Sequence, residues 1–168
     1  MRMECVLPEM TANFKCIDHI ALAVRDLEEG IAFYCNILGF ELLQRRVIRG
    51  ARTGMISAEL KKGDIKFVLC QGTEPESQVS RLVTEYGPGV AHIAFGVDDV
   101  EAVGAALAKQ GMQFDTDIIR GAGLRQLFSK RDPNSGMSFE FIERSGEAGF
   151  LEENVNELFA QLEQSGGY

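Results

Sequence analysis

Two stretches of the chain repeat one pattern of apolar and polar positions. Residues 17–24 and 90–97 are short apolar runs rich in β-branched residues, which is the pattern of a strand. The first run ends shortly before Asp26 and the second directly before Asp98. Apolar residues at helical spacing follow in 27–37 and in 100–109. The pattern therefore predicts a strand and then a helix in each stretch.

Strand-like runs separated by turn-forming residues follow both predicted helices. They lie at 40–48, 53–61 and 65–70 after the first helix, and at 114–120, 124–130 and 137–142 after the second. The order βαβββ thus occurs twice, in residues 17–71 and 90–144. A connecting segment, 72–89, separates the two, and apolar residues at helical spacing predict a C-terminal helix over 147–164.

The two stretches also resemble each other in sequence. DHIALAVRDL, residues 18–27, aligns with AHIAFGVDDV, residues 91–100, and the histidines of the two segments are 73 residues apart. An internal duplication dictates the architecture of a chain. We therefore predict an α+β fold built from two βαβββ repeats and a C-terminal helix.

Length and composition describe one compact domain over residues 1–168, because 168 residues with 45% hydrophobic and 25% charged residues suit a single core. The 17 Lys and Arg against 25 Asp and Glu give a formal net charge of −8, which disfavours nucleic acid and anionic lipid. No apolar run approaches the roughly 20 residues that span a bilayer, and charged residues interrupt the start of the chain where a secretory signal would be apolar. We expect a cytoplasmic protein with no nucleic-acid or membrane partner.

The only two histidines of the chain, His19 and His92, occupy equivalent positions in the two repeats. If the repeats pack with twofold pseudosymmetry, both rings face a common cavity. Glu140 lies within the apolar run SFEFI, where a buried carboxylate is costly unless it is paired or bound to metal. Two imidazoles and one carboxylate form the facial set typical of non-heme iron(II) oxygenases. We predict that His19, His92 and Glu140 bind one metal ion, with Fe(II) as the expected ion.

The motifs around these three residues resemble those of the vicinal oxygen chelate superfamily, which includes glyoxalases, bleomycin resistance proteins and dioxygenases. IDHIALAV, GPGVAHIAFGVDDV and SFEFIER carry the resemblance, which covers residues 17–144. It implies that the two repeats form a paired, cup-shaped mixed sheet, and it is compatible with a homodimer. Chemistry varies widely inside this superfamily, so further residues must select the branch.

The tail of the chain is similar to one branch. GFLEENVNELF, residues 149–159, resembles the helix that closes the active site in the 4-hydroxyphenylpyruvate dioxygenase family, where the pattern is roughly GFGxGNFxxLF. The chain resembles only the catalytic half of those enzymes. The resemblance implies a lid helix over 147–164, no catalytic residue beyond the metal ligands, and substrate-binding roles for Gln78, Gln126, Phe128, Phe150 and Val155.

This resemblance implies an iron(II)-dependent dioxygenase that decarboxylates and hydroxylates a small 2-oxo acid with dioxygen. Val155 stands where the family usually has a second phenylalanine, and Ala91 stands where it has a glutamine, so we expect a substrate smaller than 4-hydroxyphenylpyruvate or aliphatic. Arginines bind carboxylates through paired hydrogen bonds. The candidates for such a contact are Arg45, Arg46, Arg49, Arg52, Arg120 and Arg125.

Two other functions are compatible with the same residues. A lyase or epimerase of the glyoxalase or methylmalonyl-CoA epimerase type would hold Mn, Co, Ni or Zn with a fourth protein ligand. Ungapped counting puts Val68 at that position, and Glu59 or Gln71 would replace it in another register. The third candidate is a non-enzymatic antibiotic-binding protein on this scaffold. Extradiol dioxygenases use an additional histidine, which this chain does not have.

Overall fold

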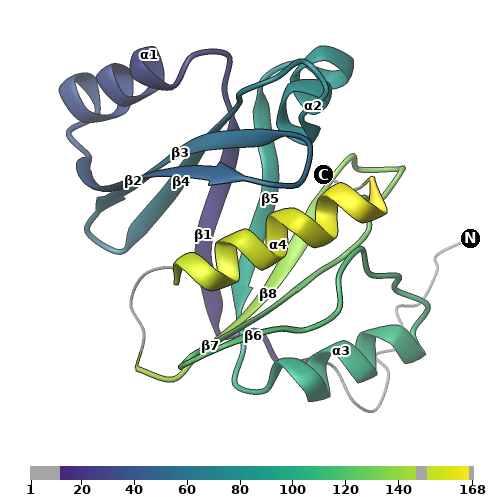
Figure 1. The fold of residues 1–168 in the computed structure, drawn as a ribbon. Helices are drawn as coiled ribbons and strands as arrows, with labels where there is room; N and C mark the ends of the chain where they lie inside the picture. Colours follow the sequence, from purple (N-terminus) through teal and green to yellow (C-terminus); the bar gives the residue numbers. More distant parts are fainter. Residues whose placement is uncertain (1–11, 147–150, 167–168) are drawn as a thin grey trace, which may run out of the picture.

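The computed structural model describes residues 12–146 and 151–166, and in these residues eight strands form one curled sheet (Figure 1). The strand order is β2-β3-β4-β1-β5-β8-β7-β6. The strands are β1 (Cys16–Ala23), β2 (Glu41–Arg49), β3 (Gly54–Lys62), β4 (Ile65–Gly72), β5 (Gly89–Gly96), β6 (Ile119–Gly121), β7 (Leu124–Phe128) and β8 (Ser138–Arg144). The helices are α1 (Leu27–Ala32), which continues as the π-helical turn η1 (Phe33–Ile37), α2 (Gln78–Tyr86), α3 (Val100–Lys109) and α4 (Glu152–Ser165).

The two repeats meet at the centre of the sheet. β1 pairs with β5 in antiparallel orientation, and these strands are the first of each repeat. Within each repeat the first strand pairs in parallel with the last, β1 with β4 and β5 with β8. The α+β fold of two βαβββ repeats with a C-terminal helix is thus confirmed.

The helices cover both faces of the sheet (Figure 1). α1 and α3 pack on the outer face, where Ile31 lies in one cluster with Leu69 and Ala58, and Val103 lies in one cluster with Phe141. α4 crosses the opposite, concave face, where its Phe159 packs in the cluster of Ala23, Met55 and Cys70. Successive residues of a strand point to opposite faces, so a strand such as β4 supplies Cys70 to the cluster under α4 and Leu69 to the cluster under α1.

The strand expected at 114–120 is wrong for residues 114–118. β6 contains only Ile119–Gly121, and Phe114 makes a single bridge to Ser129. Between them, the Thr116 hydroxyl accepts a hydrogen bond from the backbone N–H of Phe128, and the N–H of Asp117 donates to Gln161 of α4. Polar side chains compete with a strand ladder in this way, so this segment leaves the sheet and contacts α4.

α4 is held to both halves of the sheet. Near its start, Asn154 donates to the carbonyl of Leu124 at 3.1 Å. Near its end, the Glu163 carboxylate accepts hydrogen bonds from the backbone N–H groups of residues 51–53 and from the Thr53 hydroxyl, at 2.9–3.1 Å. These contacts fix α4 across the concave face of the sheet, from Leu124 in the second repeat to residues 51–53 in the first.

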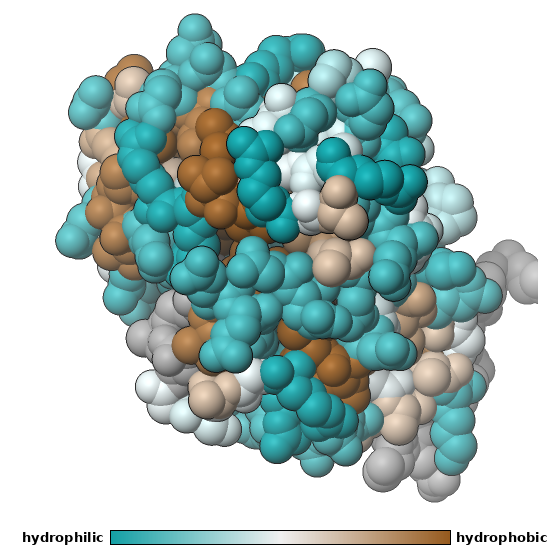
Figure 2. All heavy atoms as spheres, in the orientation of Figure 1, coloured by the Kyte–Doolittle hydropathy of each residue, from teal (hydrophilic) through white to brown (hydrophobic). Residues whose placement is uncertain are grey.

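The outward side of α4 is polar. Figure 2 shows a band of hydrophilic residues across the middle of this face, with apolar groups visible only in patches between them. Val155, Phe159 and Leu162 point inward and are buried. No described helix is long and apolar enough to cross a membrane.

Candidate metal centre

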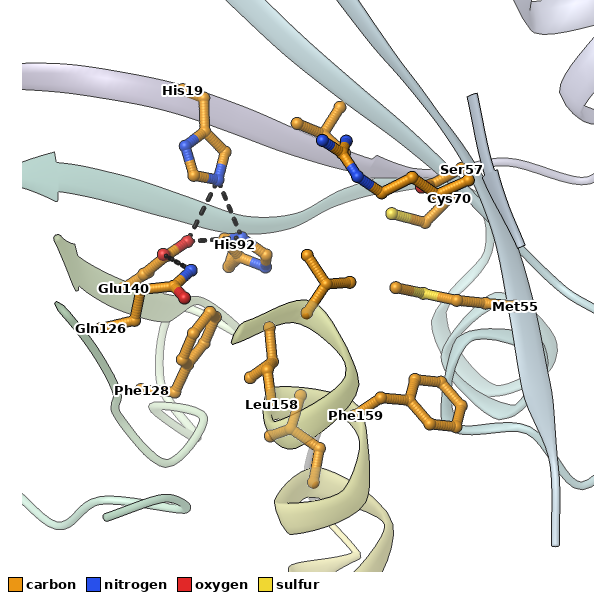
Figure 3. Close-up of a pocket in the computed structure, with 14 residues that line it drawn as sticks. His19, Met55, Ser57, Cys70, His92, Gln126, Phe128, Glu140, Leu158 and Phe159 are labelled. Atoms are coloured by element: carbon orange, nitrogen blue, oxygen red, sulfur yellow. Dashed lines mark hydrogen bonds and ion pairs between the residues drawn. The ribbon is translucent and has the colours of Figure 1, made fainter. Parts of the chain in front are cut away.

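The concave face brings the three predicted ligands together (Figure 3). His19 lies on β1, His92 on β5 and Glu140 on β8, which are neighbouring strands at the centre of the sheet. The register places Ala94 of β5 opposite both His19 and Glu140, so all three side chains project from the same face. His19 is 3% exposed and Glu140 is 1% exposed.

The donor atoms of these residues are close enough to share one cation. Nε2 of His19 lies 3.1 Å and Nε2 of His92 lies 3.2 Å from Oε2 of Glu140, and the two Nε2 atoms are 3.4 Å apart. Ligands about 2.0–2.2 Å from a divalent ion are roughly 3 Å from one another, so the observed spacing suits a single ion. Within residues 12–146 and 151–166 this is the only such cluster of three or more His, Cys, Asp or Glu side chains.

Without a metal the cluster holds a proton. Burial would lower the pKa of His19, but Glu140 and Asp18 outweigh it and raise that pKa to about 9. Burial dominates at His92 and lowers its pKa. Burial would also raise the pKa of Glu140, but the two histidines hold it well below its ordinary value. The buried carboxylate of Glu140 is therefore ionised beside a protonated His19. A divalent cation bound between them would replace the proton of His19, which would be released.

Asp18 is a site residue that strand alternation does not predict. A β-bulge between Ile17 and His19 turns the side chain of Asp18 toward the ring of His19. Its carboxylate lies 2.9 Å from Nδ1 of His19 and accepts a hydrogen bond from Nε of Arg144 at 2.7 Å. Although burial opposes it, Arg144 keeps the pKa of Asp18 low, so Nδ1 of His19 donates and Nε2 faces the cluster. The sequence signal is the adjacent Asp-His pair.

We expect Asp18→Asn to weaken metal binding by about 10- to 100-fold, because the carboxylate orients His19 and increases its basicity. Competition with a chromogenic chelator measures this affinity directly. Asp98→Asn is the matched control, since Asp98 is an exposed aspartate paired with Lys15. Equal metal affinity in the two variants would remove Asp18 from the site.

Two of the predicted substrate-binding residues contact the cluster of His19, His92 and Glu140. Nε2 of Gln126 donates to Oε1 of Glu140 at 2.8 Å, and the ring of Phe128 packs edge-to-face against His92 with centroids 5.1 Å apart. Asn154 of α4 donates in turn to Oε1 of Gln126 at 3.0 Å. A chain of hydrogen bonds thus connects α4 to Glu140, and sequence reasoning had not singled out Asn154.

The other three predicted substrate-binding residues lie in different places. Val155 of α4 lines the cavity beside the cluster. Gln78 begins α2 and is not among the residues that line the cavity. Its Nε2 instead lies 3.5 Å from the backbone carbonyl of Phe159 in α4. Phe150 falls outside the described residues.

The position expected for a fourth ligand is apolar. Val68 lines the cavity. Glu59 instead pairs with Arg46 at 3.2 Å, and Gln71 accepts a hydrogen bond from the backbone N–H of Leu27 at 2.7 Å, at the start of α1. Neither alternative residue belongs to the cluster of His19, His92 and Glu140.

A sheet of paired βαβββ repeats around a buried His-His-Glu cluster defines the class to which this protein belongs. The chain is a member of the Glyoxalase/Bleomycin resistance protein/Dioxygenase superfamily, whose model matches residues 16–141. The superfamily expected from the motifs is therefore confirmed.

The proteins similar to this chain include dioxygenases and epimerases. The chain is 28% identical to a 4-hydroxyphenylpyruvate dioxygenase of Legionella pneumophila, over 94% of this chain and 56% of that protein. It matches a triple mutant of 4-hydroxymandelate synthase from Streptomyces coelicolor with a TM-score of 0.81 at 22% identity, over 94% of this chain and 56% of that one. A variant methylmalonyl-CoA epimerase of the same organism matches with a TM-score of 0.68 at 29% identity, over 80% of this chain and 100% of that one. The chain spans about half the length of the 4-hydroxyphenylpyruvate dioxygenases of Legionella pneumophila and Pseudomonas aeruginosa that it matches.

Proposed function

We propose that the protein is an iron(II)-dependent dioxygenase that acts on a small 2-oxo acid, with oxidative decarboxylation and hydroxylation. The observation that carries the proposal is a site of three ligands, His19, His92 and Glu140, with apolar Val68 where a fourth ligand is expected. These three residues would hold iron(II), which when bound would supply a binding point for the 2-oxo acid and activation of dioxygen. The similarity to 4-hydroxyphenylpyruvate dioxygenases over 94% of the chain supports this branch.

The remaining residues of the site position a small substrate and exclude water. The cavity volume is about 50 Å³, well below the roughly 300–1,000 Å³ of sites for drug-sized ligands. Its walls are mainly apolar, with Met55 and Val68 on the sheet and Leu158 and Phe159 on α4. α4 would serve as the lid, since water expelled from a closed site strengthens the polar contacts inside it.

Anaerobic loading with iron(II), followed by dioxygen addition, tests this function. We expect dioxygen uptake and carbon dioxide release in equal amounts with at least one acid from a panel of aliphatic and aromatic 2-oxo acids. An oxygen electrode and trapped carbon dioxide measure the two. Iron-loaded protein that consumes no dioxygen with any acid of the panel would contradict the proposal.

A metal-dependent lyase or epimerase is the second candidate, and the epimerase structures at 29% identity support it. That function would use Mn, Co, Ni or Zn and a side chain that moves a proton at a carbon next to a carbonyl group. Deuterium exchange into a substrate without dioxygen uptake would identify it. A third candidate, an antibiotic-binding protein, would bind its ligand without turnover. The homodimer and the cytoplasmic location stay predictions.

A further inference from the structure

We propose that Arg46 selects the substrate by binding an anionic group at the end of the acid that lies away from the metal cluster. The proposal deepens the function above and rests on it. In these terms the substrate is a 2-oxo acid with a second carboxylate or a comparable anion. One acid group would be held at the His-His-Glu end of the cavity, and the other at Arg46.

The lining of the cavity singles out this arginine. Arg46 is the only Lys or Arg among the described residues that line it. The other arginines considered from the sequence do not line it: Arg45 pairs with Glu28, Arg49 with Glu74, and Arg120 and Arg125 lie near Glu101, while Arg52 belongs to the turn that Glu163 binds. Of the six arginines that the sequence offers for binding a substrate carboxylate, Arg46 is thus the one that lines the cavity.

The register of the sheet puts Arg46 at the far side of the cavity from His19. Arg46 on β2 lies opposite Ser57 on β3, which lies opposite Cys70 on β4, and all three line the cavity. β4 is in turn beside β1, where Cys70 pairs with Ala23, four residues along the strand from His19. Strands are about 4.8 Å apart, and the long side chain of Arg46 extends into the cavity that His19 also lines. An acid bound between the two would lie diagonally across β3 and β4.

Arg46 is held in place as a binding group would be. Its Nη1 donates to Oε2 of Glu59 at 3.2 Å, and its Nη2 donates to Oε1 of Gln44 at 2.6 Å. The side chains of Arg46 and Glu59 are only 11% and 5% exposed. A guanidinium has five N–H donors in a fixed plane, so it can bind a resident carboxylate and a ligand carboxylate together.

A purely structural role explains this pair poorly. Replacing a buried ion pair by apolar residues of similar volume is often neutral or stabilising, and most of the cavity wall is already apolar. A wall that only had to exclude water would need neither Arg46 nor Glu59. The pair therefore points to recognition of a polar ligand.

Arg46 also borders a second hollow. Together with Val155 it lines this hollow of about 210 Å³ between β2 and α4, and the same two residues line the cavity beside His19. The chain as a whole has a net charge of −8, which repels acids in general. A guanidinium at this place would attract an anionic substrate locally.

Two acids that differ only at their far end test the proposal. 2-Oxoglutarate ends in a carboxylate, and 2-oxopentanoate ends in a methyl group on a chain of the same length. We expect protein loaded with Co(II) under anaerobic conditions to bind 2-oxoglutarate at least about tenfold more tightly, as measured by calorimetry. Arg46→Met should remove this preference by weakening 2-oxoglutarate while changing the affinity for 2-oxopentanoate less than about threefold.

Arg49→Met is the matched control, because Arg49 lies on the same strand, is exposed and lines neither hollow. If Arg46→Met does not fold because Glu59 is left buried without its partner, the double variant Arg46→Met, Glu59→Leu removes both charges and should show the same loss of preference. Equal binding of the two acids by the unmodified protein, or a preference that survives in the Arg46 variants, would overturn the proposal.

The binding experiment separates this inference from the proposed function. Selective, Arg46-dependent binding without dioxygen uptake would contradict the dioxygenase and support the anion site. Dioxygen uptake that is driven only by monocarboxylic 2-oxo acids and unchanged by Arg46→Met would support the dioxygenase and contradict the anion site.

Discussion

Alanine at His19, at His92 or at Glu140 should abolish stoichiometric iron binding and turnover and leave the sheet folded. Each variant removes one of three donor atoms that lie within 3.4 Å of one another. Loss of a residue that merely orients a ligand already costs about 10- to 100-fold in affinity, so loss of a ligand should exceed that range. Iron content after gel filtration and dioxygen uptake with the best acid measure the two effects.

The matched control for this series is Glu101→Ala, which removes an exposed carboxylate that contacts Arg120 and Arg125 outside the cavity. Glu140→Gln keeps the shape of the side chain and removes its charge, so it separates ligand loss from a packing defect. Circular dichroism and thermal unfolding of the metal-free proteins report the fold. Full iron occupancy in any of the three alanine variants would show that the metal binds elsewhere.

The fold and the three central residues could be predicted because their signals are local and duplicated. Each strand and helix predicted in the first repeat reappears at a similar spacing in the second, so the elements predicted in one repeat support those predicted in the other. Equivalent positions in paired repeats bring His19 and His92 to one face, with their Nε2 atoms 3.4 Å apart. Glu140 was indicated by the cost of a carboxylate within an apolar strand.

The rest of the site depends on how distant elements pack. Asp18 should point away from His19 by strand alternation, and only the β-bulge brings the two together. Gln126 contacts Glu140 because β7 and β8 pair side by side, and it also lines the cavity, so its predicted contact with the substrate stays a prediction. Gln78 carries a comparable motif signal, yet α2 directs it toward Phe159. The polarity of these residues was visible in the sequence, but the partner of each was not.

Ending the chain at Ser145, before α4, is expected to reduce turnover by more than about 100-fold, because the cavity would open to water and lose its substrate-side wall. Metal binding should survive at low temperature, since all three ligands lie on strands of the sheet. The truncated protein should also be less stable, because Val155, Phe159 and Leu162 are buried and loss of a single buried phenylalanine side chain costs about 3–5 kcal/mol. Iron content, melting temperature and turnover at low temperature measure these three effects separately.

Glu163→Gln tests, with the chain intact, how the contact between α4 and residues 51–53 stabilises the fold. Burial would raise the pKa of Glu163, but hydrogen bonds from Thr53, Arg52 and Ala51 hold it below its ordinary value. A carboxyl group with a lowered folded pKa stabilises the protein above its unfolded pKa of about 4.3, and this contribution is lost as the pH falls through the folded pKa. The unmodified protein should therefore lose the contribution of this contact below about pH 4, and the variant should lack that part of the pH dependence. Glu157→Gln, on the exposed side of the same helix, is the control.

For the truncation, turnover of the shortened chain within about threefold of the intact protein, at equal iron content, would show that α4 is not the lid. Opening a water-excluding site should reduce turnover far more than that.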